Sequence, residues 1–149
     1  MEYVIGIDIG TSGTKTVIFN KVGETVSSAL QEYDLCQPEM GWAEQRPEDW
    51  WRAVCATIVE SIKKSGISPK DIKGVGLSGQ MHGMVLLDRH DGVIRPALLW
   101  CDLRTAPECE QITDMLGKKT LMDITGNPMI PAFTAPKIQW VKNHEQRSF

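Results

Sequence analysis

An acidic residue and a loop of small, hydroxyl-bearing residues lie close together near the start of the chain. Asp8 is followed, after one isoleucine, by a run of such residues that ends in a lysine: Gly10, Thr11, Ser12, Gly13, Thr14 and Lys15. Glycines let the backbone curl its N–H groups toward one point, which suits an anion. A carboxylate beside that anion would repel it unless a cation lay between them. The pattern therefore indicates Mg²⁺ held by Asp8, directly or through water, next to a phosphate.

Two widespread nucleotide-binding motifs do not explain this loop. The P-loop pattern G-x-x-x-x-G-K-[ST] is absent, because Gly13 is followed by Thr14 and the loop leads into a strand-like run. Residues 74–79 match G-x-G-x-x-G, but a strand-like run follows them where the dinucleotide fingerprint requires a helix, so we interpret the match as coincidental. For the loop after Asp8, a glycine-rich hairpin with a solvated aspartate stays open as the alternative to a phosphate site.

The composition excludes several classes of protein. The chain has 149 residues and a formal net charge of -3, so we expect no nucleic-acid partner, which would need a basic face. The N-terminus lacks a basic leader, and no run approaches the roughly 20 apolar residues of a membrane span. The cysteines show no CxxC spacing, which is typical of reduced thiols in a cytosol: Cys36, Cys55, Cys101 and Cys109. We expect a cytoplasmic protein with no membrane contact.

The first part of the chain predicts strands around the loop and then a helix. β-Branched and apolar residues form runs on both sides of the loop within residues 3–19, and a third run covers residues 25–33. Short connections make these three strands antiparallel. Proline and acids at residues 47–49 begin a predicted helix over 47–64. Its apolar face is expected to pack on the sheet: Trp51, Val54, Cys55, Ile58 and Ile62.

The remaining predicted elements are shorter. Strands are expected over three brief apolar runs: residues 72–77, 84–87 and 97–100. Thr105 and Glu108 have the spacing of a capping box for a helix that Gly117 ends, and Thr134 precedes a further capped helix. Together the elements predict an α/β lobe, with a mixed β-sheet that starts with three antiparallel strands and is flanked by helices.

Five separated motifs resemble the N-terminal half of the FGGY carbohydrate kinases, in particular those that act on D-xylulose. DIGTSGTK at residues 8–15 is similar to the first phosphate segment of the sugar-kinase, actin and heat-shock ATPase superfamily. The others follow in the family's order: WAEQRPEDWW at 42–51, GQMHG at 79–83, LWCDLR at 99–104 and GNPMIPAFTAPK at 126–137. The resemblance extends from Tyr3 to about Glu145, and it implies an actin-like ATPase (ribonuclease H-like) lobe.

The resemblance also implies an activity and a site. Family members transfer the γ-phosphoryl group of ATP to a sugar hydroxyl, so ATP, Mg²⁺ and D-xylulose are the expected ligands. Asp8 would be the catalytic residue that orients Mg²⁺, and residues 10–15 would bind the phosphate. Met81 and His82 match the family's substrate-binding pair, where glycerol kinases carry Arg-Glu. Asp102 and Arg104 are expected to line the same cleft, or else to form an exposed ion pair before a helix.

The chain departs from the family's pattern in two respects. The family has a glycine or an aromatic residue where this chain has Ala132, which bears on fine sugar preference. The family's kinases are also two-lobed, and their general base and adenosine site have no counterpart before Phe149. The resemblance thus implies that residues 1–149 form the N-terminal FGGY domain of a longer kinase. Its partner would be the C-terminal nucleotide-binding lobe of the same protein, and the domain would be inactive alone.

Other interpretations stay open beside this one. The substrate could be another sugar or polyol, such as ribulose, gluconate or glycerol. A non-catalytic interaction domain on an actin-like fold is a further alternative, and the Met81 and His82 pair argues against it. Apolar surface left exposed without the second lobe would also allow a homodimer.

Overall fold

The structure is a computed structural model that describes residues 2–148, and it contains two compact units. The first unit comprises the residues up to Leu35 together with Pro47–Gln80. The second comprises Cys36–Arg46 together with the residues from Met81 onward. The chain therefore leaves the first unit, returns to it and leaves again, and each unit is described by itself.

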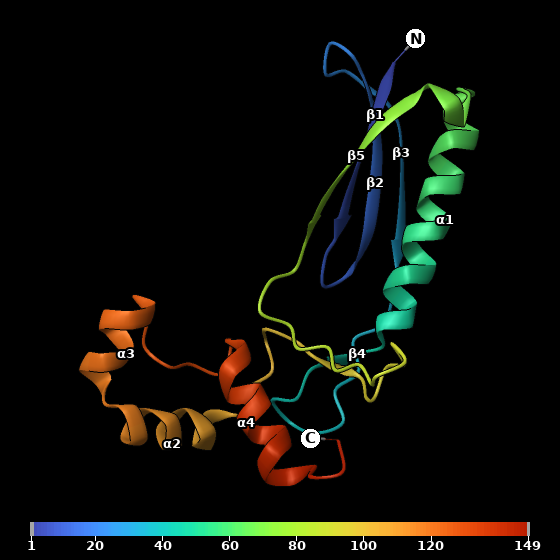
Figure 1. The fold of residues 1–149 in the computed structure, drawn as a ribbon. Helices are drawn as coiled ribbons and strands as arrows, with labels where there is room; N and C mark the ends of the chain where they lie inside the picture. The colour runs from blue at the N-terminus through green and yellow to red at the C-terminus, as the bar shows by residue number, and fades with distance from the viewer. Residues whose placement is uncertain (1, 149) are drawn as a thin grey trace. The chain divides into compact units, whose positions relative to one another are not determined.

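A four-stranded sheet forms the first unit, with the order β3-β2-β1-β5 (Figure 1). Its strands are β1 (Tyr3–Ile9), β2 (Gly13–Asn20), β3 (Thr25–Glu32) and β5 (Ile72–Gly79). β2 is antiparallel to both β1 and β3, while β5 runs parallel to β1. The predicted mixed sheet with three antiparallel strands at its start is confirmed.

The helix α1 (Pro47–Ser65) covers one face of this sheet (Figure 1). A short 3-10 turn, η1 (Pro69–Asp71), then leads into β5. The core between the helix and the sheet contains Ile5 and Ile7 of β1, Ile18 of β2 and Val54 of α1. Alternate residues of a strand point to the same face, so Ile5 and Ile7 face the helix and the intervening Gly6 does not.

The predicted apolar face of α1 is only partly right. Val54 is buried and Ile58 and Ile62 pack against the core, but Cys55 is exposed and Trp51 is 70% exposed. The buried positions are completed by small and hydroxyl residues: Ala53, Thr57 and Ser61.

A hydroxyl pair explains why the packed face of α1 differs from its apolar pattern. Thr57 Oγ1 lies 2.7 Å from Oγ1 of Thr16 on β2, and both residues are fully buried. Small side chains let the helix approach the sheet closely, and the paired hydroxyls satisfy each other there. A pattern of apolar residues at helical spacing does not predict such positions, because threonine and serine are not counted as apolar.

The second unit consists of short strands and three helices. β4 (Glu44–Gln45) pairs antiparallel with β6 (Ala97–Leu98), and α2 (Ala106–Leu116), α3 (Lys118–Thr125) and α4 (Thr134–His144) follow. α4 packs against α2. The core of this unit contains Met84, Leu98, Trp140 and Val141.

One predicted strand of the second unit is not formed as a strand, and one helix of this unit was not predicted. The expected strand at residues 84–87 is reduced to isolated bridges, which pair Met84 with Leu98 and Leu87 with Val93. The helix α3 begins after Gly117 without a side-chain cap, so no capping motif in the sequence predicts it. Within residues 2–148 there is also no helix with both the length and the apolar character that crossing a bilayer requires.

The two predicted side-chain caps in this unit are not formed among the described residues. Thr105 precedes α2 without a capping hydrogen bond from its side chain. Glu108 instead accepts from Asn143 Nδ2 of α4 at 3.1 Å, because tertiary contact between the helices offers it a partner. Phe133, and not Thr134, is the residue at the N-terminal cap position of α4.

Candidate functional site

The loop after Asp8 is a tight turn that joins β1 and β2. The last pair of the two strands is Ile9 with Thr14, and the Gly10 N–H donates to the Gly13 carbonyl at 3.0 Å. A Cβ atom added to Gly13 would lie 2.7 Å from the Gln31 carbonyl oxygen of β3. Only glycine fits at such a distance, so the turn rests directly on the neighbouring backbone.

Tyr33, which sequence reasoning missed, fixes this turn from the β3 side. Its hydroxyl donates to the Gly10 carbonyl at 2.5 Å and accepts from Thr14 Oγ1 at 3.4 Å. Its backbone N–H donates to the Ser12 carbonyl at 3.4 Å. Burial raises the pKa of the Tyr33 hydroxyl above its ordinary value of 10.0, which keeps this donor far from deprotonation at neutral pH. Tyr33 ends the predicted third strand, and no spacing in the sequence connects it to the loop.

The end of β5 supports the same turn from the opposite side. The Gln80 N–H donates to the Ile9 carbonyl at 2.8 Å, and Thr11 Oγ1 donates to Gln80 Oε1 at 3.2 Å. The turn is therefore held from both neighbouring strands, which is the preorganisation that an anion-binding backbone needs.

Asp8 and Lys15 are opposite each other at the mouth of this turn. They are register partners on β1 and β2, both are exposed, and both line a depression of about 310 Å³ on the sheet. Among residues 2–148 no group of three or more His, Cys, Asp or Glu side chains could hold a metal ion. A single carboxylate fits Mg²⁺, which usually keeps several waters and takes phosphate oxygens as further ligands.

We expect Tyr33→Phe to destabilise the protein by about 1 kcal/mol, because the Gly10 carbonyl would lose its donor. Urea unfolding of the two proteins measures this change as a lower midpoint for the variant. The exposed Ser12→Ala variant serves as a control and should unfold at the wild-type urea concentration. Equal midpoints for Tyr33→Phe and the wild type would show that the hydrogen bond contributes nothing.

Met81 and His82 lie on the surface of the second unit. Both are exposed, and His82 has a left-handed backbone with φ of 61°. The His82 ring lies edge-to-face on the ring of Phe133, with centroids 5.0 Å apart. Its carbonyl accepts a hydrogen bond from Thr134 Oγ1 at 3.3 Å. The pair predicted to bind the sugar is thus accessible, and His82 contacts the start of α4.

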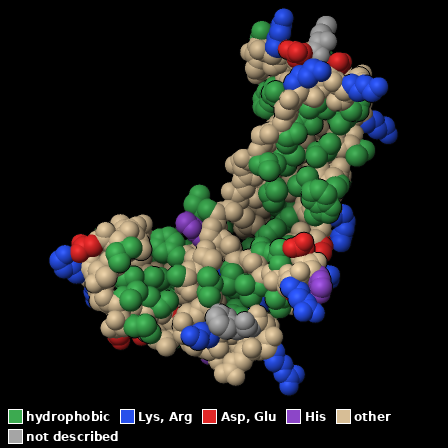
Figure 2. Space-filling view, in the orientation of Figure 1, with side chains coloured by type: hydrophobic (Ala, Val, Ile, Leu, Met, Phe, Trp, Pro, Cys, Tyr) green, Lys and Arg blue, Asp and Glu red, His purple; other side chains and the backbone are tan. Residues whose placement is uncertain are grey.

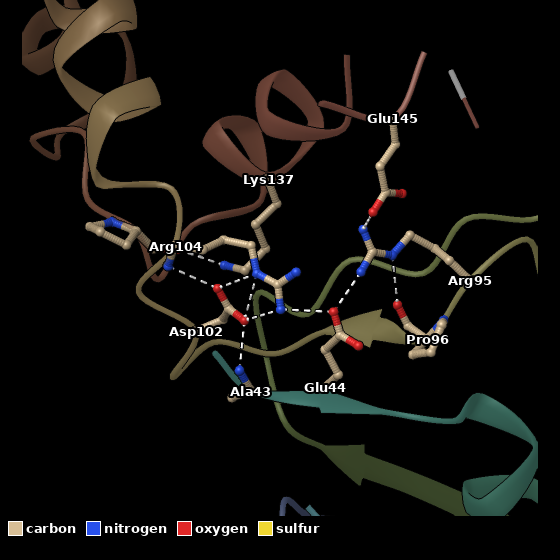
Figure 3. A network of polar contacts seen from close by, with 9 residues as sticks. Ala43, Glu44, Arg95, Pro96, Asp102, Arg104, Lys137 and Glu145 are labelled. Carbon is tan, nitrogen blue, oxygen red and sulfur yellow. Dashed lines mark hydrogen bonds and ion pairs between the residues drawn. The ribbon is translucent and has the colours of Figure 1, made fainter. Parts of the chain in front are cut away.

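Asp102 and Arg104 form an ion pair that is buried, so the alternative of an exposed ion pair is wrong. Asp102 is fully buried, and the Arg104 side chain is 1% exposed. The Arg104 guanidinium lies 2.8 Å from Asp102 Oδ2, and the Ala43 N–H donates to the same oxygen at 2.7 Å (Figure 3). Backbone contacts from residues 41–43 hold this segment in place. Direct contact of either side chain with a sugar stays a prediction.

The ion pair belongs to a larger buried network. Glu44 Oε1 accepts from Arg104 at 2.8 Å and from Arg95 at 2.6 Å, and Arg95 also pairs with Glu145 at 2.6 Å (Figure 3). The Arg104 guanidinium stacks 3.6 Å above the ring of Trp42. The charges are therefore paired as well as buried, which is the condition under which a protein interior tolerates them.

The predicted site residues are divided between the two units. Asp8 and residues 10–15 belong to the first unit, whereas Met81, His82, Asp102 and Arg104 belong to the second. The geometry of each group is therefore described by the contacts within its own unit.

The chain belongs to the FGGY family of carbohydrate kinases, because the model of the family's N-terminal domain matches residues 3–149. It is similar to the xylulose kinase of Bacillus subtilis (strain 168), with 45% identity over 149 residues, all of this chain and 30% of the relative. It spans about 30% of the length of the curated relatives it matches.

Solved structures show the same relationship. The crystal structure of xylulose kinase from Rhodospirillum rubrum matches with a TM-score of 0.92 and 27% identity, covering 99% of this chain and 30% of that one. The crystal structure of gluconate kinase from Lactobacillus acidophilus matches with a TM-score of 0.91 and 30% identity, over 99% and 30% of the two chains. The actin-like α/β fold expected from the sequence is confirmed.

Proposed function

We propose that this chain is the N-terminal part of a kinase that transfers the γ-phosphoryl group of ATP to D-xylulose, giving D-xylulose 5-phosphate. The observation that carries the proposal is the rigid turn of residues 10–13, with Asp8 and Lys15 exposed at its mouth. This arrangement suits Mg²⁺ and a phosphate better than it suits a structural hairpin. The similarity to xylulose kinases over the whole chain supports D-xylulose as the acceptor.

In this proposal the turn binds the transferring phosphoryl group and Asp8 holds Mg²⁺. Mg²⁺ would neutralise charge on the phosphoryl oxygens. The Gly10 N–H is used inside the turn, so its part is to keep the turn in shape. Ser12 and Lys15 are exposed there and would contribute a hydroxyl and a positive charge.

The sugar would bind to the exposed pair of the second unit. A neutral His82 imidazole can both donate to and accept from neighbouring hydroxyls, and the Met81 thioether can pack against the carbon chain. Asp102 and Arg104 are assigned to the sugar side as well, and their burial favours a role in supporting the segment around them.

A further part of the proposal is that other residues of a longer protein complete the site. The chain spans about 30% of its curated relatives, which supports a C-terminal nucleotide-binding lobe as its partner. Figure 2 shows hydrophobic side chains on the surface of the first unit. On its edge strand β5, Val75 and Leu77 are 61% and 75% exposed. Exposed apolar surface of this kind favours association, with that lobe or, as an alternative, in a homodimer. We place the whole protein in the cytoplasm.

The proposal is tested by comparing sugars as substrates of the whole protein. A coupled assay that detects ADP would give kcat/KM for D-xylulose, D-ribulose, gluconate and glycerol. We expect the highest value for D-xylulose. A higher value for another acceptor would correct the sugar, and ATP-dependent partner binding without turnover of any acceptor would favour the non-catalytic alternative.

We expect His82→Ala to reduce kcat/KM for D-xylulose by a factor that corresponds to about 1 to 3 kcal/mol, since sugar hydroxyls would lose their partner on leaving water. His90→Ala is the matched control, because His90 is an exposed histidine of the same unit outside the predicted site. Unchanged D-xylulose kinetics in His82→Ala, together with a loss on another sugar, would show that the substrate assignment is wrong.

A further inference from the structure

Lys137 on α4 is a fully buried lysine with an unusual set of partners. Its Nζ donates to three successive backbone carbonyls, those of Pro131 at 2.7 Å, Ala132 at 2.6 Å and Phe133 at 3.0 Å. These carbonyls belong to the segment that leads into the helix carrying the lysine. Figure 3 shows Lys137 extending from α4 toward the Asp102 and Arg104 pair.

The position of this ammonium group is unfavourable in itself. Removing a charge from water costs free energy, and a positive charge near the first turn of a helix opposes the helix dipole. Burial lowers the pKa of Lys137 from 10.5 to about 8, and the nearby charge of Asp102 opposes that shift. At neutral pH the group therefore keeps three protons, one for each carbonyl. An apolar side chain would fill the same space without this cost in free energy. The presence of a lysine here therefore suggests that its three hydrogen bonds have a role.

The segment that Lys137 holds is the one on which His82 rests. Phe133 supplies the ring that meets the His82 ring edge-to-face, and Thr134 donates to the His82 carbonyl. A non-glycine residue with φ of 61° costs free energy and persists only where its surroundings hold it. The contacts from residues 133 and 134 thus help to hold both the ring and the backbone of His82.

We propose that Lys137 is a positioning residue, which fixes the His82 side chain for the sugar by holding residues 131–134 in place. The proposal rests on the proposed function in one respect, the assignment of His82 to the sugar. The positioning itself follows from contacts within the second unit and can be measured without any substrate.

The test uses the whole protein with Lys137→Met, which keeps an unbranched apolar chain but removes the three donors. We expect the KM for D-xylulose to rise about tenfold, because a displaced His82 would lose hydrogen bonds to the sugar. The KM for ATP should stay within about twofold, since the change acts on the sugar side. Lys142→Met, an exposed lysine of the same helix, is the matched control and should leave both values unchanged.

A second readout is the NMR signal of the His82 ring in protein labelled with ¹³C-histidine, without sugar. The signal is assigned by its loss in His82→Ala. We expect it to shift in Lys137→Met and to keep its wild-type position in Lys142→Met. An unchanged His82 signal, or equal increases of the KM for D-xylulose and for ATP, would overturn the positioning role.

Phe133→Leu covers the case in which Lys137→Met does not fold. It removes the ring that meets His82 while the carbonyls bound to Lys137 remain, so we expect the same shift of the His82 signal and a raised KM for D-xylulose. If Phe133→Leu leaves both unchanged, the proposed path through Phe133 is wrong. Absence of sugar phosphorylation by the wild-type protein would instead refute the proposed function, and the NMR comparison would still decide the positioning.

Discussion

Replacing Asp8 by asparagine in the whole protein should lower turnover at least about a hundredfold, with a much smaller change in sugar binding. The amide keeps the shape of the side chain and loses its charge, so Mg²⁺ would lose its anionic protein ligand. Metal-mediated stabilisation of the charge on a transferring phosphoryl group is worth several kcal/mol. The substitution leaves His82, the residue predicted to bind the sugar, unchanged, so sugar affinity should largely survive.

Steady-state kinetics at several Mg²⁺ concentrations measure this effect. Asp123→Asn is the matched control, because Asp123 is an exposed aspartate on α3 that pairs with Lys119. It should show the turnover and the Mg²⁺ dependence of the wild type. Near-normal turnover of the Asp8→Asn protein would remove Asp8 from the mechanism.

Arg104→Met should destabilise the second unit by about 3 to 5 kcal/mol, because it would leave the buried Asp102 without its ion-pair partner, while Glu44 would keep only Arg95. Asp102 is fully buried and the Glu44 side chain is 10% exposed, so water cannot replace the lost guanidinium. A loss of this size is a large part of the total stability of a typical domain.

Urea unfolding followed by tryptophan fluorescence measures this loss, since Trp42 and Trp140 lie under the Arg104 guanidinium. Arg52→Met is the matched control. The Arg52 side chain is 74% exposed and pairs with Asp49 at 2.9 Å, so its removal should cost less than about 1 kcal/mol. Losses of similar size for the two variants would show that burial of the network contributes nothing to stability.

The first unit could be predicted well from the sequence because its elements are long and locally encoded. β1, β2 and β3 appear as separate β-branched runs with short connections, and the glycines between the first two mark the turn. The role of Tyr33 could not be predicted, because it depends on the way β3 lies beside the turn. The hydrogen bond between Thr16 and Thr57 could not be predicted either, since hydroxyl residues are not part of an apolar pattern.

The second unit could be predicted less well because distant residues determine it. β4 and β6 contain two residues each, too few for any periodicity. The two-residue spacing of Asp102 and Arg104 suggests an ion pair, but its burial depends on Ala43 and Glu44, which lie far away in the sequence. Lysine is usually an exposed residue on a helix, so the sequence does not predict that Lys137 is buried. Its burial depends on the segment before α4, whose carbonyl groups accept hydrogen bonds from it.

Phosphoryl transfer followed by ³¹P NMR tests the central claim most directly. With the whole protein, ATP, Mg²⁺ and D-xylulose, we predict a sugar phosphomonoester signal that grows as ATP is converted to ADP. In the same experiment the chain of 149 residues should be folded and should give no such signal, because positioning of the nucleotide and removal of the hydroxyl proton need groups from both lobes. A sugar phosphate formed by this chain alone, or none formed by the whole protein with any sugar, would contradict the claim.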